Sequence, residues 1–353
     1  MKEYRSILVH SLVNLGVVLL TTSAIALLKQ CYPQARITML VRPVVREAVE
    51  NNPVIDEVIL FDYKARQNSL RKMWAMAREL RRRRFDLAIS FDRKLRPAIL
   101  CWMAGIPQRV CPDRVFDDKP SRVTSLYTKV VPIRHNLDTT LQAETYQEII
   151  RGITGTAEHA RPVMARILPA HEEKAARLLA SLPAGAKHIA LCVKGTFPLK
   201  TWPKEYFAAV ADGLAALQPA AFFIVGAPGD REYADEVIAA MHQPVLNLCG
   251  QTSLMELAAL FRQSDLLVTV DTGATHIAAT TGVPMVVMYG CTSPKRWHPI
   301  NENARVLTSE ESCCPCHCSA ADCPTNPRPA CLWNITPEMV LEKCRELMSG
   351  RKS

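Results

Sequence analysis

A group of side chains suited to binding an anion follows an apolar run in the last third of the sequence. Leu266–Val270 has the composition of a buried strand and ends in Asp271-Thr272-Gly273, and a helix with His276 in its first turn is expected to follow. The free N–H groups at a helix N-terminus bind anions, and Gly273 would let a diphosphate approach closely. Thr272 adds a hydroxyl and His276 a further hydrogen-bond donor. The structural alternative is that Asp271 only caps the helix.

Two other expected strands also end in residues suited to a nucleotide. Strand 188–193 is followed by Gly195-Thr196 and then by Lys200, which could hold phosphate as a point charge, although an ordinary exposed lysine is the alternative. Strand 221–225 runs into a turn that ends in Asp230, whose carboxylate could accept hydrogen bonds from a ribose diol. The chain has neither the GxGxxG fingerprint nor a Walker loop at these positions. These strand ends therefore favour a nucleotide site that serves neither hydride transfer nor ATP hydrolysis.

Strands and helices alternate along the whole chain. Expected strands before residue 100 are 6–10, 36–41, 57–61 and 85–90, and the same rhythm restarts at 172 and ends with a last expected strand at 285–289. Residues 111–136 show no clear periodicity, so we expect a loop there. The length of 353 residues suits two α/β domains, and the Gly- and Pro-containing stretch 154–169 is typical of a linker. We predict two doubly wound Rossmann-like domains, residues 1–160 and 161–353, with ligands beyond the carboxyl ends of the strands.

The net charge of +9 is unevenly distributed. Residues 1–165 carry 26 Lys and Arg against 16 Asp and Glu, whereas residues 166–353 carry 17 against 18. A basic first half indicates an anionic partner, which could be a phosphorylated substrate, an acidic membrane surface or nucleic acid. For the run Arg81–Arg84 alone there is a simpler explanation, because basic residues on a solvated face at a helix C-terminus interact favourably with the helix dipole. We expect no nucleic-acid partner, because few aromatic residues accompany these arginines and no known binding module is present.

The N-terminus has some features of a signal peptide, since MKEYR precedes an apolar stretch. His10, Asn14 and Gly16 interrupt that stretch, which fits a strand, a turn and a helix better. No segment offers the roughly 20 uninterrupted apolar residues of a membrane span. We therefore expect a cytoplasmic protein with at most peripheral membrane contact.

The chain resembles the glycosyltransferase family 9 heptosyltransferases, which move a heptose from ADP-heptose to the lipopolysaccharide inner core with inversion. The most specific match is Asp271-Thr272-Gly273 with His276, followed by Tyr289-Gly290 and Arg296-Trp297. Supporting matches run over nearly the whole chain: 15–16 with 19–22, 199–203, 226–230 and 248–254.

The resemblance implies the GT-B fold, in which two domains face a cleft, with the acceptor on the N-terminal domain and the donor on the C-terminal one. It implies an ADP-heptose-like donor, a lipid-linked glycan acceptor, peripheral contact with the inner membrane and no metal for catalysis, since Lys200 and the helix N-terminus offset the leaving group's charge. The acceptor-side loop would contain Ser11, Asn14 and Gly16. The donor-binding residues would be Thr196, Lys200, Asp230 (more often Glu in the family), Thr252, Asp271, Thr272, Gly273 and His276.

One position departs from the family pattern in a way that affects catalysis. The family has an aspartate after the first-loop glycine, which removes the proton from the acceptor hydroxyl, and here that residue is Val17. Three interpretations follow. His10 could act as the base, although it ends a buried strand; the chain could bind a nucleotide sugar as a pseudoenzyme without transferring it; or the position has been altered by mutation in an otherwise intact enzyme. The catalytic residue is therefore unknown.

Six of the thirteen cysteines lie in a loop at residues 313–331. Cytosolic thiols at this density are more often metal ligands than disulfides, and four of seven side chains, the six cysteines and His317, could supply a tetrahedral structural Zn²⁺ site. The spacing does not form a CxxC…CxxC pair, and family members often have several cysteines here, so a purely structural loop is the alternative. The candidate ligands are Cys313, Cys314, Cys316, Cys318, Cys323 and Cys331.

Overall fold

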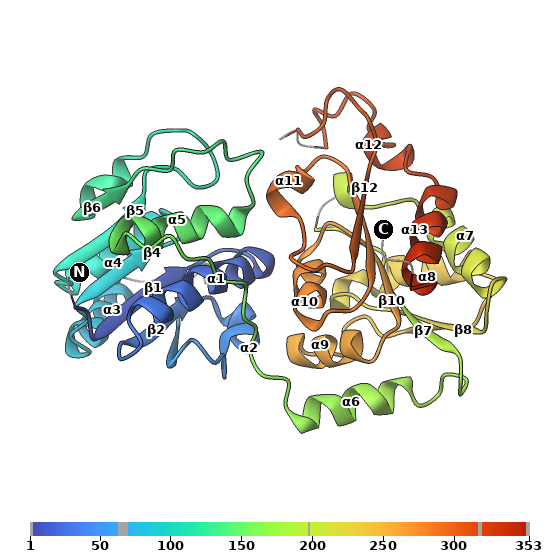
Figure 1. Cartoon of the computed structure of the whole chain (residues 1–353), viewed down its shortest axis with the longest axis horizontal. Coiled ribbons are helices and arrows are strands. Elements are labelled where there is room, and N and C mark those ends of the chain that lie inside the picture. The colour runs from blue at the N-terminus through green and yellow to red at the C-terminus, as the bar shows by residue number, and fades with distance from the viewer. Residues whose placement is uncertain (1–2, 63–69, 197, 317–319, 351–353) are drawn as a thin grey trace. The chain divides into compact units, whose positions relative to one another are not determined.

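The computed structural model describes residues 3–62, 70–196, 198–316 and 320–350 (Figure 1). The chain divides into two compact units, Met1–Arg166 and Ile167–Ser353, and the division falls within the segment expected to be a linker. Each unit contains one parallel sheet of six strands among the described residues. The predicted α/β class, with two doubly wound Rossmann-like sheets, is confirmed.

The N-terminal unit has the strand order β3-β2-β1-β4-β5-β6. The direction of winding reverses between β1 and β4, and ligands bind at such a point beyond the carboxyl ends of the strands. Its strands are β1 (Ser6–Ser11), β2 (Arg36–Val41), β3 (Glu57–Leu60), β4 (Leu87–Ser90), β5 (Gln108–Pro112) and β6 (Lys129–Val131). Its helices are α1 (Leu15–Cys31), α2 (Arg46–Val49), α3 (Leu70–Arg82), α4 (Leu95–Met103) and α5 (Gln142–Thr154).

Helix α1 is buried along most of its length and packs against α5. It nevertheless contains three consecutive hydroxyl residues, Thr21, Thr22 and Ser23, which are all buried. Each hydroxyl donates to the carbonyl three residues earlier, so no buried donor is lost. Thr22 Oγ1 also accepts the backbone N–H of Val163 at 2.9 Å, which ties the end of the unit to this helix.

The C-terminal unit has the strand order β12-β11-β10-β7-β8-β9 and reverses its winding between β10 and β7. Its strands are β7 (Lys187–Cys192), β8 (Ala220–Ile224), β9 (Val245–Asn247), β10 (Leu266–Val270), β11 (Met285–Tyr289) and β12 (Ala304–Thr308). Its helices are α6 (Pro169–Leu179), α7 (Lys204–Ala215), α8 (Arg231–Ala239), α9 (Leu254–Arg262), α10 (Gly273–Thr281), α11 (Pro294–Trp297), α12 (Ala330–Trp333) and α13 (Pro337–Met348).

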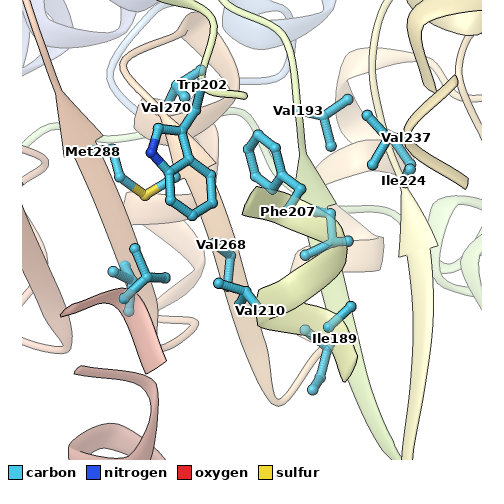
Figure 2. Close-up of a cluster of buried hydrophobic side chains, with 14 of the residues drawn as sticks. Ile189, Val193, Trp202, Phe207, Val210, Ile224, Val237, Val268, Val270 and Met288 are labelled. Atoms are coloured by element: carbon cyan, nitrogen blue, oxygen red, sulfur yellow. The ribbon is translucent and has the colours of Figure 1, made fainter. Parts of the chain in front are cut away.

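Trp202 anchors one loop of this unit in the core (Figure 2). Its ring is fully buried and meets Phe207 edge to face, with ring centroids 4.9 Å apart. Its Nε1 donates to the Ile335 carbonyl at 2.9 Å, so its only polar atom is satisfied. Because Lys200 lies two residues earlier, this anchor also fixes the position of that lysine.

None of the helices in the described part of the chain is long and apolar enough to cross a membrane.

Candidate functional site

Three loops of the C-terminal unit meet at the carboxyl edge of its sheet. β10 lies between β7 and β11, so the loops that follow these three strands are neighbours. The Lys200 ammonium, after β7, pairs with Asp271 Oδ2, after β10. Thr292 Oγ1, after β11, donates to the same carboxylate oxygen at 2.7 Å. The structure thus brings two of the predicted residues into direct contact and adds Thr292, which was not among them.

The Lys200–Asp271 pair is nearly buried, with the side chains 15% and 8% exposed. An ion pair of this kind persists only if its members keep good partners, because each charge has lost most of its hydration. Asp271 is also held through its backbone N–H, which donates to the Met288 carbonyl at 3.1 Å. The pair therefore holds a lysine ammonium at the point where the sheet reverses.

The N-terminus of α10 begins directly after Asp271. The N-cap residue is Thr272, and its side chain makes no capping hydrogen bond to the first N–H groups of the helix. The structural alternative, in which Asp271 caps the helix, is therefore wrong, because the Asp271 carboxylate turns to Lys200 and Thr292 instead. The uncapped N–H groups, with Thr272 and Gly273 half-buried beside them, leave a site for an anion.

His276 lies in the first turn of α10 and is 5% exposed. Its pKa is lowered to about 4, mainly by burial; Asp271 opposes this shift, and the positive charge of Lys200 and the neighbouring His298 contribute to it. Its Nδ1 has no hydrogen-bond partner among the described residues. The imidazole is therefore neutral near pH 7, with one donor and one acceptor nitrogen to offer a ligand.

We expect the buried neutral His276 to make the free energy of unfolding depend on pH. Its pKa is about 4 in the folded chain and 6.5 ordinarily, so between these values the unfolded chain binds the extra proton. The stabilisation is complete above pH 6.5 and is lost as the pH falls toward 4, by about 3 kcal/mol in all. Denaturant unfolding at pH 7 and pH 4.5 should show a smaller pH effect in His276→Gln. An equal pH effect in both chains would contradict the assignment.

Gly195 allows the loop after β7 to close on Lys200. A Cβ at this position would lie 2.3 Å from the Lys200 carbonyl oxygen and 2.4 Å from Lys200 Cβ, which is too close for any side chain. Only glycine therefore permits the approach that carries Lys200 to Asp271.

We expect Gly195→Ala to weaken ADP binding by about tenfold or more, because relieving the clash moves Lys200 and such overpacking costs about 1–3 kcal/mol. Gly229→Ala is the matched control. Gly229 lies in the next loop of the same edge, and a Cβ there would meet nothing within 4 Å. Calorimetric titration with ADP compares the two variants. Equal ADP affinities would show that ADP binding does not need the close approach of Gly195 to Lys200.

Asp230 lies at the end of the neighbouring loop, after β8, and already has partners. Its Oδ2 accepts the Ala227 N–H at 2.8 Å, and its Oδ1 lies 3.4 Å from the Lys194 ammonium. Its side chain is 24% exposed, so a diol could still approach it. The predicted ribose contact stays a prediction.

The remaining donor-side residues, Thr196 and Thr252, make no hydrogen bond to Asp271 among the described residues. Thr196 is exposed and lines a cavity of about 400 Å³ with Lys194, Tyr233 and Trp333. Thr252 is half-buried and follows β9, the edge strand, directly before the Ser253 that caps α9. Neither is placed against the Lys200–Asp271 pair by a hydrogen bond or ion pair among the described residues.

The predicted acceptor-side loop lies after β1, at the reversal point of the N-terminal unit. Ser11 ends β1 and is fully buried, and its Oγ has no hydrogen-bond partner in the described part of the chain. Asn14 is exposed at the N-cap of α1, but its side chain does not cap the helix. Gly16 and Val17 form the first turn of α1, which contains no acidic residue.

His10 is fully buried one residue before this loop. Its Nδ1 lies 3.8 Å from Asp92 Oδ1, and burial lowers its pKa. Asp92 in turn accepts the N–H groups of Leu12 at 2.6 Å and Lys94 at 3.0 Å, so it holds the loops after β1 and β4 together. This setting is that of a core histidine, because a fully buried ring cannot reach an acceptor hydroxyl.

The cysteine-rich loop is described only in part, because His317 and Cys318 lie outside the described residues. The sulfur atoms of Cys313 and Cys314 are 3.9 Å apart. Burial raises the pKa of Cys314, and a hydrogen bond to Cys331 raises it further. No group of three or more His, Cys, Asp or Glu side chains within the described ranges is arranged to hold a metal. Cys316 and Cys323 join no such group, and the structural Zn²⁺ site stays a prediction.

Two parallel doubly wound sheets, the second with an uncapped helix N-terminus at its carboxyl edge, are the architecture of the GT-B fold class. The family model for glycosyltransferase family 9 (heptosyltransferase) matches residues 73–324, and the chain belongs to this family. It is 25% identical over 303 residues to lipopolysaccharide heptosyltransferase 2 of Escherichia coli (strain K12), covering 83% of this chain and 84% of that protein.

Solved structures agree with this assignment. The glycosyl transferase family 9 protein from Veillonella parvula DSM 2008 superposes with a TM-score of 0.87 at 25% identity, over 99% of both chains. E. coli heptosyltransferase WaaC with ADP has the same fold, with a TM-score of 0.71 at 18% identity over 97% of this chain and 99% of that one.

Proposed function

We propose that this chain transfers a heptose or a related sugar from an ADP-heptose-like donor to a lipopolysaccharide core or a similar phosphorylated, lipid-linked glycan. The donor would bind the C-terminal unit and the acceptor the N-terminal unit, on the cytoplasmic side of the inner membrane. The observation that supports this most is the buried Lys200–Asp271 pair beside the uncapped N-terminus of α10. The relative named above is a lipopolysaccharide heptosyltransferase, and one structural neighbour was solved with ADP.

The proposed chemistry is loss of a nucleoside diphosphate from the sugar's anomeric carbon as an acceptor oxygen attacks the opposite face. Negative charge develops on the diphosphate, where the Lys200 ammonium and the α10 N–H groups would stabilise it. Asp271 and Thr292 would position Lys200, and neutral His276 would donate a hydrogen bond to the diphosphate or the sugar. Asp230 would take the ribose, and Thr196, Thr252, Thr272 and Gly273 would complete the donor site.

A second candidate function is nucleotide-sugar binding without transfer. Val17 favours it, because this residue occupies the family's general-base position and cannot accept a proton. The first turn of α1 contains no acidic residue, and His10 is fully buried. Without a base at this position, any transfer by the unaltered chain would depend on positioning and charge stabilisation alone and would be slow.

Acceptor-dependent release of ADP from ADP-heptose separates the two candidates. Release by the unaltered chain above the rate without acceptor would support the transferase. Saturable ADP-heptose binding with no release over long incubation would support the binding protein. Failure to bind or release ADP would contradict both candidates and the choice of donor.

A further inference from the structure

Helices α3 and α4 of the N-terminal unit pack side by side on one part of its core. Their inner faces contribute Ala77 and Leu80 from α3 and Leu100 and Cys101 from α4. At their C-terminal ends Arg81 joins them, because its Nη2 donates to the Met103 carbonyl at 3.0 Å. The two helices therefore present their outer faces as neighbouring parts of one surface.

That surface carries large apolar side chains in water. Trp74 on α3 is 65% exposed and Trp102 on α4 is 57% exposed, and Leu70 and Leu95 are 81% and 53% exposed. Leu70, Trp74 and Arg78 follow one another at four-residue spacing and so lie on one face of α3. In contrast, Trp202, Trp297 and Trp333 of the C-terminal unit are buried or half-buried. Both tryptophans of the N-terminal unit thus face solvent on adjacent helices.

The same surface is strongly basic. Residues 70–84 contain seven Lys and Arg and one acidic residue, Glu79. Glu79 pairs with Arg83, which also reaches Glu57. In the described part of the chain no carboxylate lies within ion-pair distance of five of these cations, which are Arg71, Lys72, Arg78, Arg82 and Arg84. The surface therefore combines exposed indoles with positive charge that no described carboxylate pairs with.

We propose that the outer faces of α3 and α4 dock on the surface of an anionic lipid bilayer. Tryptophan favours the boundary between headgroups and acyl chains, where the ring is buried and its N–H stays wet. Arg and Lys lay their methylene stems along the apolar zone and reach anionic headgroups with their charges. Nucleic acid would match the charge but would leave Leu70 and Leu95 in water. The inference rests on the proposed function in one respect, because a lipid-linked acceptor lies at a membrane.

Vesicle co-sedimentation of the full chain tests this surface without donor or acceptor. We expect binding to phosphatidylcholine vesicles that contain phosphatidylglycerol, little binding to phosphatidylcholine alone, and a decline as salt rises. Trp74→Ala/Trp102→Ala and Arg78→Glu/Arg82→Glu should each lower the partition coefficient at least tenfold. Arg177→Glu/Arg345→Glu, which reverses two exposed charges of the C-terminal unit, is the matched control and should bind as the unaltered chain does.

Circular dichroism and ADP titration of the same variants show whether they remain folded with the donor site intact. Vesicle binding that is unchanged in both surface variants would overturn the proposal, as would equal binding to neutral and anionic vesicles. Salt-sensitive retention of DNA without vesicle binding would assign the surface to nucleic acid and also overturn it. Vesicle binding without ADP binding would uphold this surface while contradicting the proposed function, so the two failures are distinguishable.

Discussion

Replacing Val17 with aspartate should raise the rate of acceptor-dependent ADP release by about 10²–10⁴-fold, the usual contribution of a positioned general base. Val17 is half-buried in the first turn of α1, directly after Gly16 and beyond the carboxyl end of β1. No acidic residue now occupies this turn. A carboxylate introduced there would lie at the positive end of the helix dipole. It would therefore be ionised at neutral pH and ready to accept a proton. Steady-state assay of released ADP gives the ratio of rates.

Val17→Asn is the matched control for this substitution. Asparagine has nearly the shape of aspartate and similar polarity but cannot take the proton, so it should leave the rate unchanged. Equal rates in the Asp and Asn variants would mean that polarity alone matters at position 17. Fast release by the unaltered chain would mean that another group acts as the base, and the slow transfer inferred from Val17 would be wrong.

Replacing Lys200 with methionine should lower the affinity for ADP by about 10–100-fold, because a charge-assisted hydrogen bond contributes about 1.5–3 kcal/mol. It should also destabilise the C-terminal unit by about 3–5 kcal/mol, because the buried Asp271 carboxylate loses its counterion. Lys187→Met is the control. That lysine also pairs with an aspartate of the same unit, Asp265, but is 52% exposed, so its loss should change stability and ADP affinity little.

The double variant Lys200→Met/Asp271→Asn separates the two effects of Lys200. Removing the buried charge should restore most of the lost stability, whereas ADP affinity should stay low because the ammonium is still missing. Isothermal titration and denaturant unfolding of the four chains complete a double-mutant cycle. Recovery of ADP affinity in the double variant would show that Lys200 only supports the fold.

The sequence predicted most of the strongly buried strands and also the edge strand β3, but it missed β5, β6 and β12. β1, β4, β10 and β11 are fully or almost fully buried, so their apolar runs are unmistakable. The expected loop at 111–136 is partly wrong, because it contains the end of β5, all of β6 and a 3-10 turn at Arg122–Leu126, and β12 after residue 289 was missed. β6 has three residues, two of them exposed, and β12 has one buried residue, so neither carries a clear apolar signal.

The sequence predicted which strand ends carry the site residues, but it did not predict which of these side chains contact one another. Lys200 and Asp271 are 71 residues apart, and they meet only because β10 pairs with β7. Thr292 follows β11 in the same way, and its position after a strand was the one signal that could have found it. The direction of the Asp271 carboxylate, toward Lys200 and away from the helix it precedes, depends on that long-range partner. Local sequence therefore left the capping alternative open, and the folded chain does not use it.

Titration of the unaltered full chain with ADP, UDP and inorganic diphosphate tests the donor site most directly. The structure predicts one saturable ADP site, weakened in Lys200→Met and Gly195→Ala, with inorganic diphosphate competing for it because the Lys200 ammonium and the α10 N-terminus hold the diphosphate. UDP should bind less tightly if the donor is an adenine nucleotide. Absence of ADP binding at millimolar concentration, or ADP affinity that neither substitution changes, would contradict a nucleotide-sugar site at this edge of the sheet.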